Sequence, residues 1–265
     1  MSTFKSFIYA VVLFGALACA VQDAVAQATD SGSAVAAAKK RGHLIVGVKY
    51  DFPPFGFVDE KRQVVGFEVD LARELAASLL GSRDAIELVE VSGPNRIPFL
   101  VTGKVDLVIA TLSITPERAK TISFSEPFYT GGYTIMVGKD RSDIKGLADL
   151  SGKRVVMTRG ATAEALLTKL NPPAQQLLKM EQISELFSVM QAGRADAAVQ
   201  DVALLQPFVS KHPEYKLVGG LLNEEPWGVG IRKDDRETVT WINDSLARFR
   251  QSGKIDEWLK KWGLH

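Results

Sequence analysis

Short apolar segments alternate with amphipathic segments from about Gly42 to the end of the chain. Short continuous apolar runs predict buried strands, and apolar residues at helical spacing predict helices. Strands are expected at residues 44–48, 86–91, 105–110, 133–138, 153–158, 195–200 and 228–231. Helices are expected at residues 67–80, 96–103, 117–122, 163–170, 183–193, 202–210, 237–253 and 255–263. This alternation favours an α/β fold with mostly parallel sheets and helices on both faces.

One pattern occurs twice along the chain. Residues 103–111 (GKVDLVIAT) resemble residues 193–201 (GRADAAVQD), with a glycine, a basic residue, an aspartate, a buried strand and a polar last residue. Two similar α/β units in the two halves of the chain explain this pattern, and coincidence between two helix–strand joints is the alternative. Because ligands bind beyond the carboxyl ends of parallel strands, Thr111 and Asp201 are expected at that edge, one in each lobe.

The N-terminal segment has the layout of a secretory signal peptide. Lys5 precedes the apolar run 7–20, and Ala24-Val25-Ala26 forms a small-x-small cleavage site. Residues 1–26 are therefore expected to be removed near Ala26 on export, and residues 27–39 to form a flexible leader. A membrane anchor is the first alternative, although the run is shorter than a spanning helix requires. A lipoprotein modified at Cys19 is the second.

Composition narrows the possible functions. The formal net charge is +1, and no basic stripe of the kind that binds nucleic acid is present. The three histidines are far apart in sequence, so no metal site is expected. Cys19 is the only cysteine, and a processed chain has no thiol and no disulfide. About 239 residues then remain, enough to bury one or two cores.

The segment 110–118 (ATLSITPER) has the features of an anion site. It leaves a predicted strand and enters a helix, with Thr115 as the N-cap and Pro116 as the first helical residue. Arg118 follows in the first turn, where a cation opposes the helix dipole unless an anion binds nearby. The alternative is an ordinary capped helix with a solvent-facing arginine.

The same segment resembles the signature of the family 3 bacterial extracellular solute-binding proteins, the polar amino-acid receptors of ABC importers. ATLSITPER is followed by FSEPFYTGG (124–132), and similar motifs extend over residues 40–264. The resemblance implies a two-lobe clamp of the type II periplasmic-binding-protein kind, each lobe a mixed, mostly parallel sheet flanked by helices. Lobe one comprises residues 40–132 and 228–265, and lobe two residues 133–227.

The resemblance also implies roles for individual residues. Arg118 pairs with the ligand's α-carboxylate, and Ser113 contacts the carboxylate or the ammonium. Thr162 adds a donor from lobe two, Asp201 holds the α-ammonium, and Phe52 forms an aromatic wall.

Lys49 and Arg96 are expected to face the ligand side chain. Together with Thr111 they resemble the pattern of members that bind aspartate or glutamate, because a second carboxylate requires its own cations. The alternatives have Arg96 cap a surface helix and pair Lys49 with Asp51 or another acidic residue. Glutamine, asparagine or another polar amino acid is then the ligand. Arg159 is read as a rim residue.

The expected function is therefore capture of a polar L-amino acid in the periplasm, by hinge closure, for an ABC permease. The protein is expected to be a monomer without catalytic residues, cofactor, metal or nucleic-acid partner. A cyclohexadienyl-dehydratase-like enzyme is an alternative, but residues 158–165 lack the asparagine and residues 201–205 the glutamate that such enzymes carry. A signalling receptor is another.

Several further residues are read as structural. Trp241, Trp258 and Trp262 are expected to anchor the terminal helices, and Asp106 and Asp196 to satisfy turn donors. Trp227 is expected either to floor the cleft or to pack the hinge.

Overall fold

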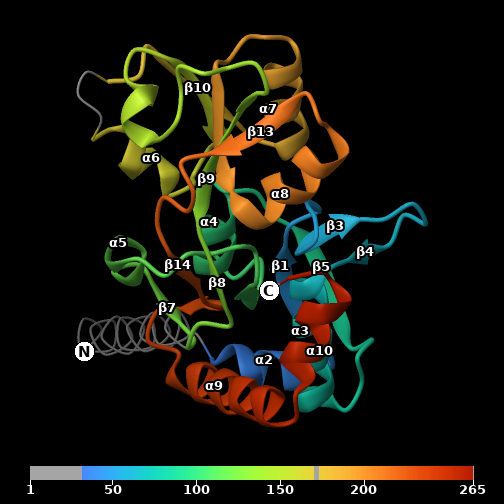
Figure 1. Cartoon of the computed structure of the whole chain (residues 1–265). Coiled ribbons are helices and arrows are strands. Elements are labelled where there is room, and N and C mark those ends of the chain that lie inside the picture. Colours follow the sequence, from blue (N-terminus) through green and yellow to red (C-terminus); the bar gives the residue numbers. More distant parts are fainter. Residues whose placement is uncertain (1–31, 170–172, 265) are drawn as a thin grey trace, which may run out of the picture.

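The computed structural model describes residues 32–169 and 173–264. Two five-stranded sheets form two lobes, one above the other in Figure 1. The expected signal peptide and Cys19 lie outside the described residues.

The first sheet has the strand order β5-β1-β6-β15-β7. Its strands are β1 (Leu44–Val48), β5 (Ile86–Glu90), β6 (Leu107–Val108), β7 (Ile122–Phe124) and β15 (Gly230–Arg232). β1 pairs in parallel with β5 and β6, whereas β15 runs antiparallel to β6 and β7. The helices of this lobe are α2 (Ala34–Arg41), α3 (Phe67–Leu80), α4 (Arg96–Val101), α5 (Pro116–Ala119), α9 (Arg236–Gln251) and α10 (Lys254–Lys261). A small sheet of β2 (Asp51–Phe52), β3 (Gly56–Val58) and β4 (Val64–Val65) lies beside it.

The second sheet has the order β11-β10-β12-β9-β13. Its strands are β9 (Tyr133–Gly138), β10 (Arg154–Thr158), β11 (Gln176–Met180), β12 (Ala197–Asp201) and β13 (Tyr215–Val218). The helices of this lobe are η1 (Leu147–Leu150), α6 (Ala163–Leu167), α7 (Ile183–Gln191) and α8 (Val202–Lys211). β10 pairs in parallel with β11 and β12, whereas β9 runs antiparallel to both of its neighbours, β12 and β13.

The chain passes between the lobes through two short strands. β8 (Tyr129–Gly131) and β14 (Glu225–Trp227) pair antiparallel, with Trp227 opposite Tyr129. Figure 1 shows this ribbon between the two sheets. A pair of adjacent crossing strands is the geometry of a hinge, because rotation about a few residues moves whole lobes.

The repeated sequence pattern corresponds to equivalent positions in the two lobes. β6 and β12 each lie at the centre of their sheet. Asp106 accepts a hydrogen bond from the Ile45 N–H at the start of β1 (2.8 Å), and Asp196 accepts one from the Arg154 N–H at the start of β10 (2.8 Å). The two aspartates are structural, as predicted, but the backbone donors that they satisfy lie at strand entries rather than in turns, and both also pair with arginines.

The expectation of a flexible leader is wrong for residues 34–39, which lie in α2. Ser33 caps this helix by accepting the Ala36 N–H, and the Ala34 N–H donates to Asp235 at 2.8 Å. Ala34, Val35 and Ala38 are buried against lobe one. Small residues hid this contact in the sequence, because alanine gives a weak hydrophobic pattern.

The strands missed from the sequence are mostly edges or crossings. β11 and β13 are the edges of the second sheet and are only half-buried, so they lack a continuous apolar run. β7 lies at the edge of the first sheet, and β8 and β14 have three residues each. β1 and α3 appear at their predicted residues and the other central strands overlap their predicted ranges, although β6 has only two of its six predicted residues; buried strands require the apolar runs that predict them.

Candidate functional site

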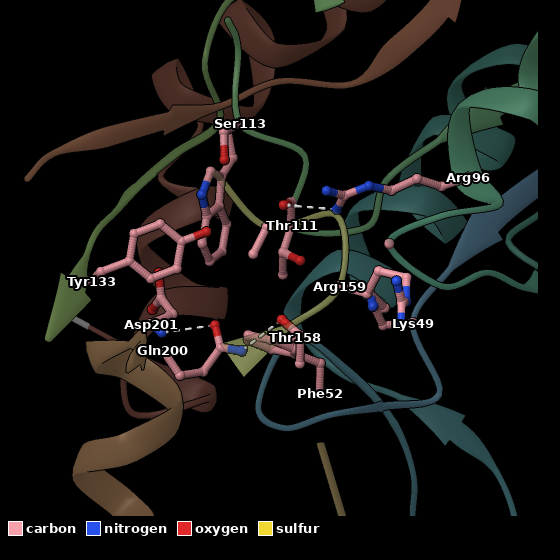
Figure 2. Close-up of a pocket in the computed structure, with 13 residues that line it drawn as sticks. Lys49, Phe52, Arg96, Thr111, Ser113, Tyr133, Thr158, Arg159, Gln200 and Asp201 are labelled. Atoms are coloured by element: carbon pink, nitrogen blue, oxygen red, sulfur yellow. Dashed lines mark hydrogen bonds between the residues drawn. The ribbon is translucent and has the colours of Figure 1, made fainter. Parts of the chain in front are cut away.

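A cavity of about 380 Å³, including its mouth, lies between the lobes. Six of the residues predicted to bind ligand line it: Lys49, Phe52, Arg96, Thr111, Ser113 and Asp201. The other lining residues are Gly93, Tyr133, Thr158, Arg159, Ala161, Gln200 and Trp227. Figure 2 shows Lys49, Arg96 and Arg159 on one side and Tyr133, Gln200 and Asp201 on the other. The remaining two predicted residues, Arg118 and Thr162, do not line it but contact lining residues: Arg118 donates to the Ser113 carbonyl, and Thr162 lies 3.1 Å from the Tyr133 hydroxyl.

Lys49 presents a buried ammonium group to the cavity. Its side chain follows β1 and is 6% exposed. Burial, and then the charge of Arg96, lowers the pKa of Lys49 to about 8. Among the described residues no carboxylate pairs with this ammonium, and Asp51 instead accepts the Ile183 N–H at 3.0 Å. The predicted alternative of a Lys49–Asp51 ion pair is therefore not found.

Arg96 is also buried, 4% exposed, at the start of α4. Its Nη1 donates to the carbonyls of Ala110 (2.5 Å) and Thr111 (3.0 Å), at the end of the segment that follows β6. Burial, and then the charge of Arg118, lowers the pKa of Arg96 to about 9. The alternative of a solvent-facing helix cap is wrong, because α4 packs with this residue turned into the cleft.

Arg118 reaches the opposite lobe. Its Nη1 donates to the Ser113 carbonyl at 2.8 Å, and its Nη2 donates to the Gly160 carbonyl at 2.9 Å. Arg96 Nη2 donates to the same Gly160 oxygen at 3.4 Å. Thr115 caps α5 by accepting the Arg118 N–H, which holds the backbone of Arg118 in place. Two guanidinium groups from lobe one thus converge on one oxygen of lobe two.

Asp201 is the main acidic group in the cavity wall. It ends β12 and caps α8, with Oδ1 accepting the Ala203 N–H (2.9 Å) and Oδ2 the Gly132 N–H (3.0 Å). Burial, opposed by these hydrogen bonds and reinforced by the charge of Glu225, raises the pKa of Asp201 to about 7. Each carboxylate oxygen can accept a further hydrogen bond, so an ammonium group can still bind here.

Glu225 was not predicted, yet it joins the predicted hydroxyl groups. It lies on β14, 8% exposed, and accepts hydrogen bonds from Ser113 of lobe one and Thr162 of lobe two. Asn223 donates to it at 3.0 Å, and Thr162 also lies 3.1 Å from the Tyr133 hydroxyl. The sequence did not indicate that Glu225 is buried, because acidic residues such as the adjacent Glu224 and Glu225 are usually exposed.

The polar residue Gln200 bridges β12 and β10. Its side-chain amide donates to the Thr158 hydroxyl at 2.9 Å, and its carbonyl accepts the Asp201 N–H at 2.9 Å, as Figure 2 shows. These contacts hold Asp201 at the end of its strand.

Aromatic rings close the other sides of the cavity. Phe52 and Trp227 are 4% and 3% exposed. Trp227 contacts Phe55 and Tyr129 with ring centres 4.8 and 5.1 Å apart. It therefore both lines the cavity and packs the hinge, so the two expectations for this residue hold together.

Arg159 lies at the rim, with half of its side chain exposed, and its Nε donates to Glu181 at 2.6 Å.

Within residues 32–169 and 173–264, none of the helices has both the length and the apolar character that a membrane span requires. The same part of the chain holds no group of three histidine, cysteine or acidic side chains placed to bind a metal ion.

Comparisons with known proteins agree with this architecture. The chain is 30% identical over 257 residues to the ABC transporter glutamine-binding protein GlnH of Bacillus subtilis, covering 96% of this chain and 93% of that one. It is 32% identical over 262 residues to the glutamate/aspartate import solute-binding protein of Escherichia coli, covering 93% and 86%.

Among solved structures, an ancestral amino acid-binding protein, a precursor of cyclohexadienyl dehydratase, superposes with a TM-score of 0.79. It is 36% identical, and the match covers 87% of this chain and 99% of that one. The fold is the type II periplasmic-binding-protein clamp. Residues 44–265 match the family model of the bacterial extracellular solute-binding proteins, family 3. The chain belongs to this family.

Proposed function

We propose that this protein binds one acidic amino acid, aspartate or glutamate, in the cavity and delivers it to the permease of an ABC importer. One observation carries the choice of ligand: Lys49, 6% exposed, lines the cavity, and its ammonium makes no ion pair with any described residue, although Asp51, Glu68 and Glu90 act on it over a longer distance and raise its pKa. An unpaired charge that is largely removed from water carries a desolvation penalty, so a ligand that supplies the opposite charge binds there favourably.

The charges around the cavity complement a dicarboxylic amino acid. Lys49 and Arg96 suit the side-chain carboxylate, and Arg118 with the Ser113 segment suits the α-carboxylate. Asp201 suits the α-ammonium, which also relieves the repulsion between Asp201 and Glu225.

The remaining predicted residues complete this arrangement. Thr111 lines the cavity while its carbonyl binds Arg96, Phe52 provides an apolar wall, and Thr162 adds a hydroxyl from lobe two. Ligand contacts to both lobes bias the hinge toward its closed form. The proposal includes export by the signal peptide of residues 1–26 and action in the periplasm.

Glutamine is the second candidate, because one of the relatives named above is a glutamine-binding protein and the match covers nearly the whole chain. An amide is neutral and leaves the Lys49 ammonium without a counter-charge. The two ligands therefore differ in their dependence on this residue.

The test is calorimetric titration of the processed protein, unfolded and refolded to remove any bound ligand. Aspartate, glutamate, glutamine, asparagine and arginine are titrated into the wild type and Lys49→Met. Tight one-to-one binding of an acidic amino acid, reduced about 100-fold or more in Lys49→Met, is expected. Lys120→Met is the matched control, because Lys120 is exposed and pairs only with Glu117.

Glutamine binding that is tight in both proteins, with no response to aspartate or glutamate, would show that the proposed ligand is wrong. No response to any amino acid would contradict the amino-acid class itself, and prearomatic acids would then be titrated and tested for turnover.

A further inference from the structure

Glu68 lies directly beneath the cavity without lining it. It is in the first turn of α3 and is fully buried. Its Oε1 accepts the Thr111 N–H at 2.6 Å, and its Oε2 has no hydrogen-bond partner among the described residues. The start of α3 is held in place because the Glu68 N–H donates to the Phe55 carbonyl at 2.9 Å. A carboxylate is thus fixed next to the site with one of its two oxygens unpaired.

Thr111, the residue that Glu68 holds, has an unusual backbone. Its φ is +47°, in the left-handed region that a β-branched residue seldom adopts. This conformation turns the carbonyl of Thr111 toward Arg96, whose Nη1 also binds the preceding carbonyl of Ala110. The direction of the Arg96 guanidinium therefore depends on the backbone of Thr111.

We propose that Glu68 is a positioning residue for ligand binding: its hydrogen bond to the Thr111 N–H holds the left-handed turn that aims Arg96 into the cavity. The inference rests on the proposed function, in which Arg96 binds the ligand. Strain of this kind persists where the surroundings over-determine it, and a buried carboxylate acceptor is a strong local constraint.

The charges that face Glu68 are consistent with this role. Lys49 and Arg96 lie close enough to favour its ionised form, whereas Asp201 opposes it. Burial, the largest influence, raises the pKa of Glu68 to about 7. Binding is therefore measured at about pH 7.5, between the pKa of Glu68 and that of Lys49, where both groups are mostly charged.

Two substitutions separate the hydrogen bond from the charge. Glu68→Gln keeps an oxygen that accepts the Thr111 N–H and removes the charge, whereas Glu68→Met removes both. We expect the affinity for aspartate and glutamate to fall about tenfold or more in Glu68→Met and to stay within about threefold of the wild type in Glu68→Gln. A loss in Glu68→Gln as large as in Glu68→Met would assign the effect to charge and overturn the inference.

Thr111→Gly tests the backbone step, because glycine adopts a positive φ without help. In the Thr111→Gly background, Glu68→Met is expected to change the affinity by less than about threefold. If Glu68→Met lowered the affinity as much in the Thr111→Gly background as in the wild type, the inference would be overturned. Glu74→Met is the matched control: Glu74 is also on α3 but pairs with Arg83 and Lys254, so this variant should melt earlier and bind normally.

A crystal structure of Glu68→Met supplies a readout that needs no ligand. A shifted Thr111 backbone and a displaced Arg96 would support the inference, and an unchanged φ with Arg96 in place would overturn it. If the wild type binds glutamine alone, the proposed ligand fails while the same series with glutamine still tests Glu68. If the wild type binds acidic amino acids and Glu68→Met binds as tightly, only the positioning role fails.

Discussion

Arg118 of lobe one donates a hydrogen bond across the cleft to the carbonyl of Gly160 in lobe two, at 2.9 Å. Arg96 donates to the same oxygen. A carboxylate is a stronger acceptor than a carbonyl, so the two carboxylates of an acidic amino acid would replace the Gly160 oxygen, one at each guanidinium group, and join the lobes through charge.

Arg118→Ala is expected to lower the affinity for the amino acid about 100-fold or more while the fold persists, because a buried ion pair loses one partner. Arg118→Lys should give an intermediate loss, since lysine keeps the charge but not the paired donors. Calorimetry measures the affinity, and circular dichroism checks the fold. Arg73→Ala is the control, because Arg73 pairs with the exposed Asp84 and donates to the Arg83 carbonyl, and it does not line the cavity. A change of less than tenfold in Arg118→Ala would remove Arg118 from the carboxylate site.

Gly93→Ala is expected to weaken binding about tenfold or more by blocking closure. A Cβ on Gly93 would lie 2.1 Å from the carbonyl oxygen of Arg159, so the two lobes could not approach as they do here. Small-angle scattering should show that ligand no longer compacts this variant. Gly138→Ala is the control, because a Cβ on Gly138 meets no atom within 4 Å. Wild-type affinity and compaction in Gly93→Ala would show that closure does not need this contact.

The sequence predicted the centre of each sheet and most of the cavity wall, for related physical reasons. β1, β6, β10 and β12 are buried strands, so their apolar runs are visible without a structure. Residues at the ends of such strands, Thr111 and Asp201 among them, then fall at the ligand edge.

The missed residues depend on long-range contacts. Glu68 meets Thr111 across 43 positions, and Glu225 meets Ser113 across 112. A glutamate in the first turn of a helix is normally explained by its favourable interaction with the helix dipole. The local sequence therefore did not single out Glu68. The burial of an acid becomes visible only when the packing is known.

The affinity for aspartate and glutamate is expected to fall as the pH rises above about 8. Burial lowers the pKa of Lys49 to about 8, and the proposed side-chain contact needs its protonated form. Above that pH the free protein loses the proton, so the association constant should fall by up to about tenfold per pH unit. Calorimetry from pH 7 to 9 measures this fall, below the range where Arg96 and the ligand's own α-ammonium lose their protons. Lys49→Met should show a much smaller fall over this range, and an equal fall in that variant would assign the titration to another group.

Lys49→Met is expected to stabilise the folded protein although it weakens ligand binding. A lysine pKa that burial lowers from 10.5 to about 8 means that the folded state binds fewer protons than the unfolded chain between these pH values. The wild type therefore gains stability as the pH rises from 8 to 10.5, and the full cost of the buried charge is present at pH 7.

Methionine fills a similar volume without the charge, so the free energy of unfolding at pH 7 should rise by about 2–3 kcal/mol. Urea unfolding measures this value, and Lys120→Met should change it by less than about 0.5 kcal/mol. A Lys49→Met protein less stable than the wild type at pH 7 would mean that the ammonium is compensated within the protein, and the argument for an anionic ligand would lose its basis.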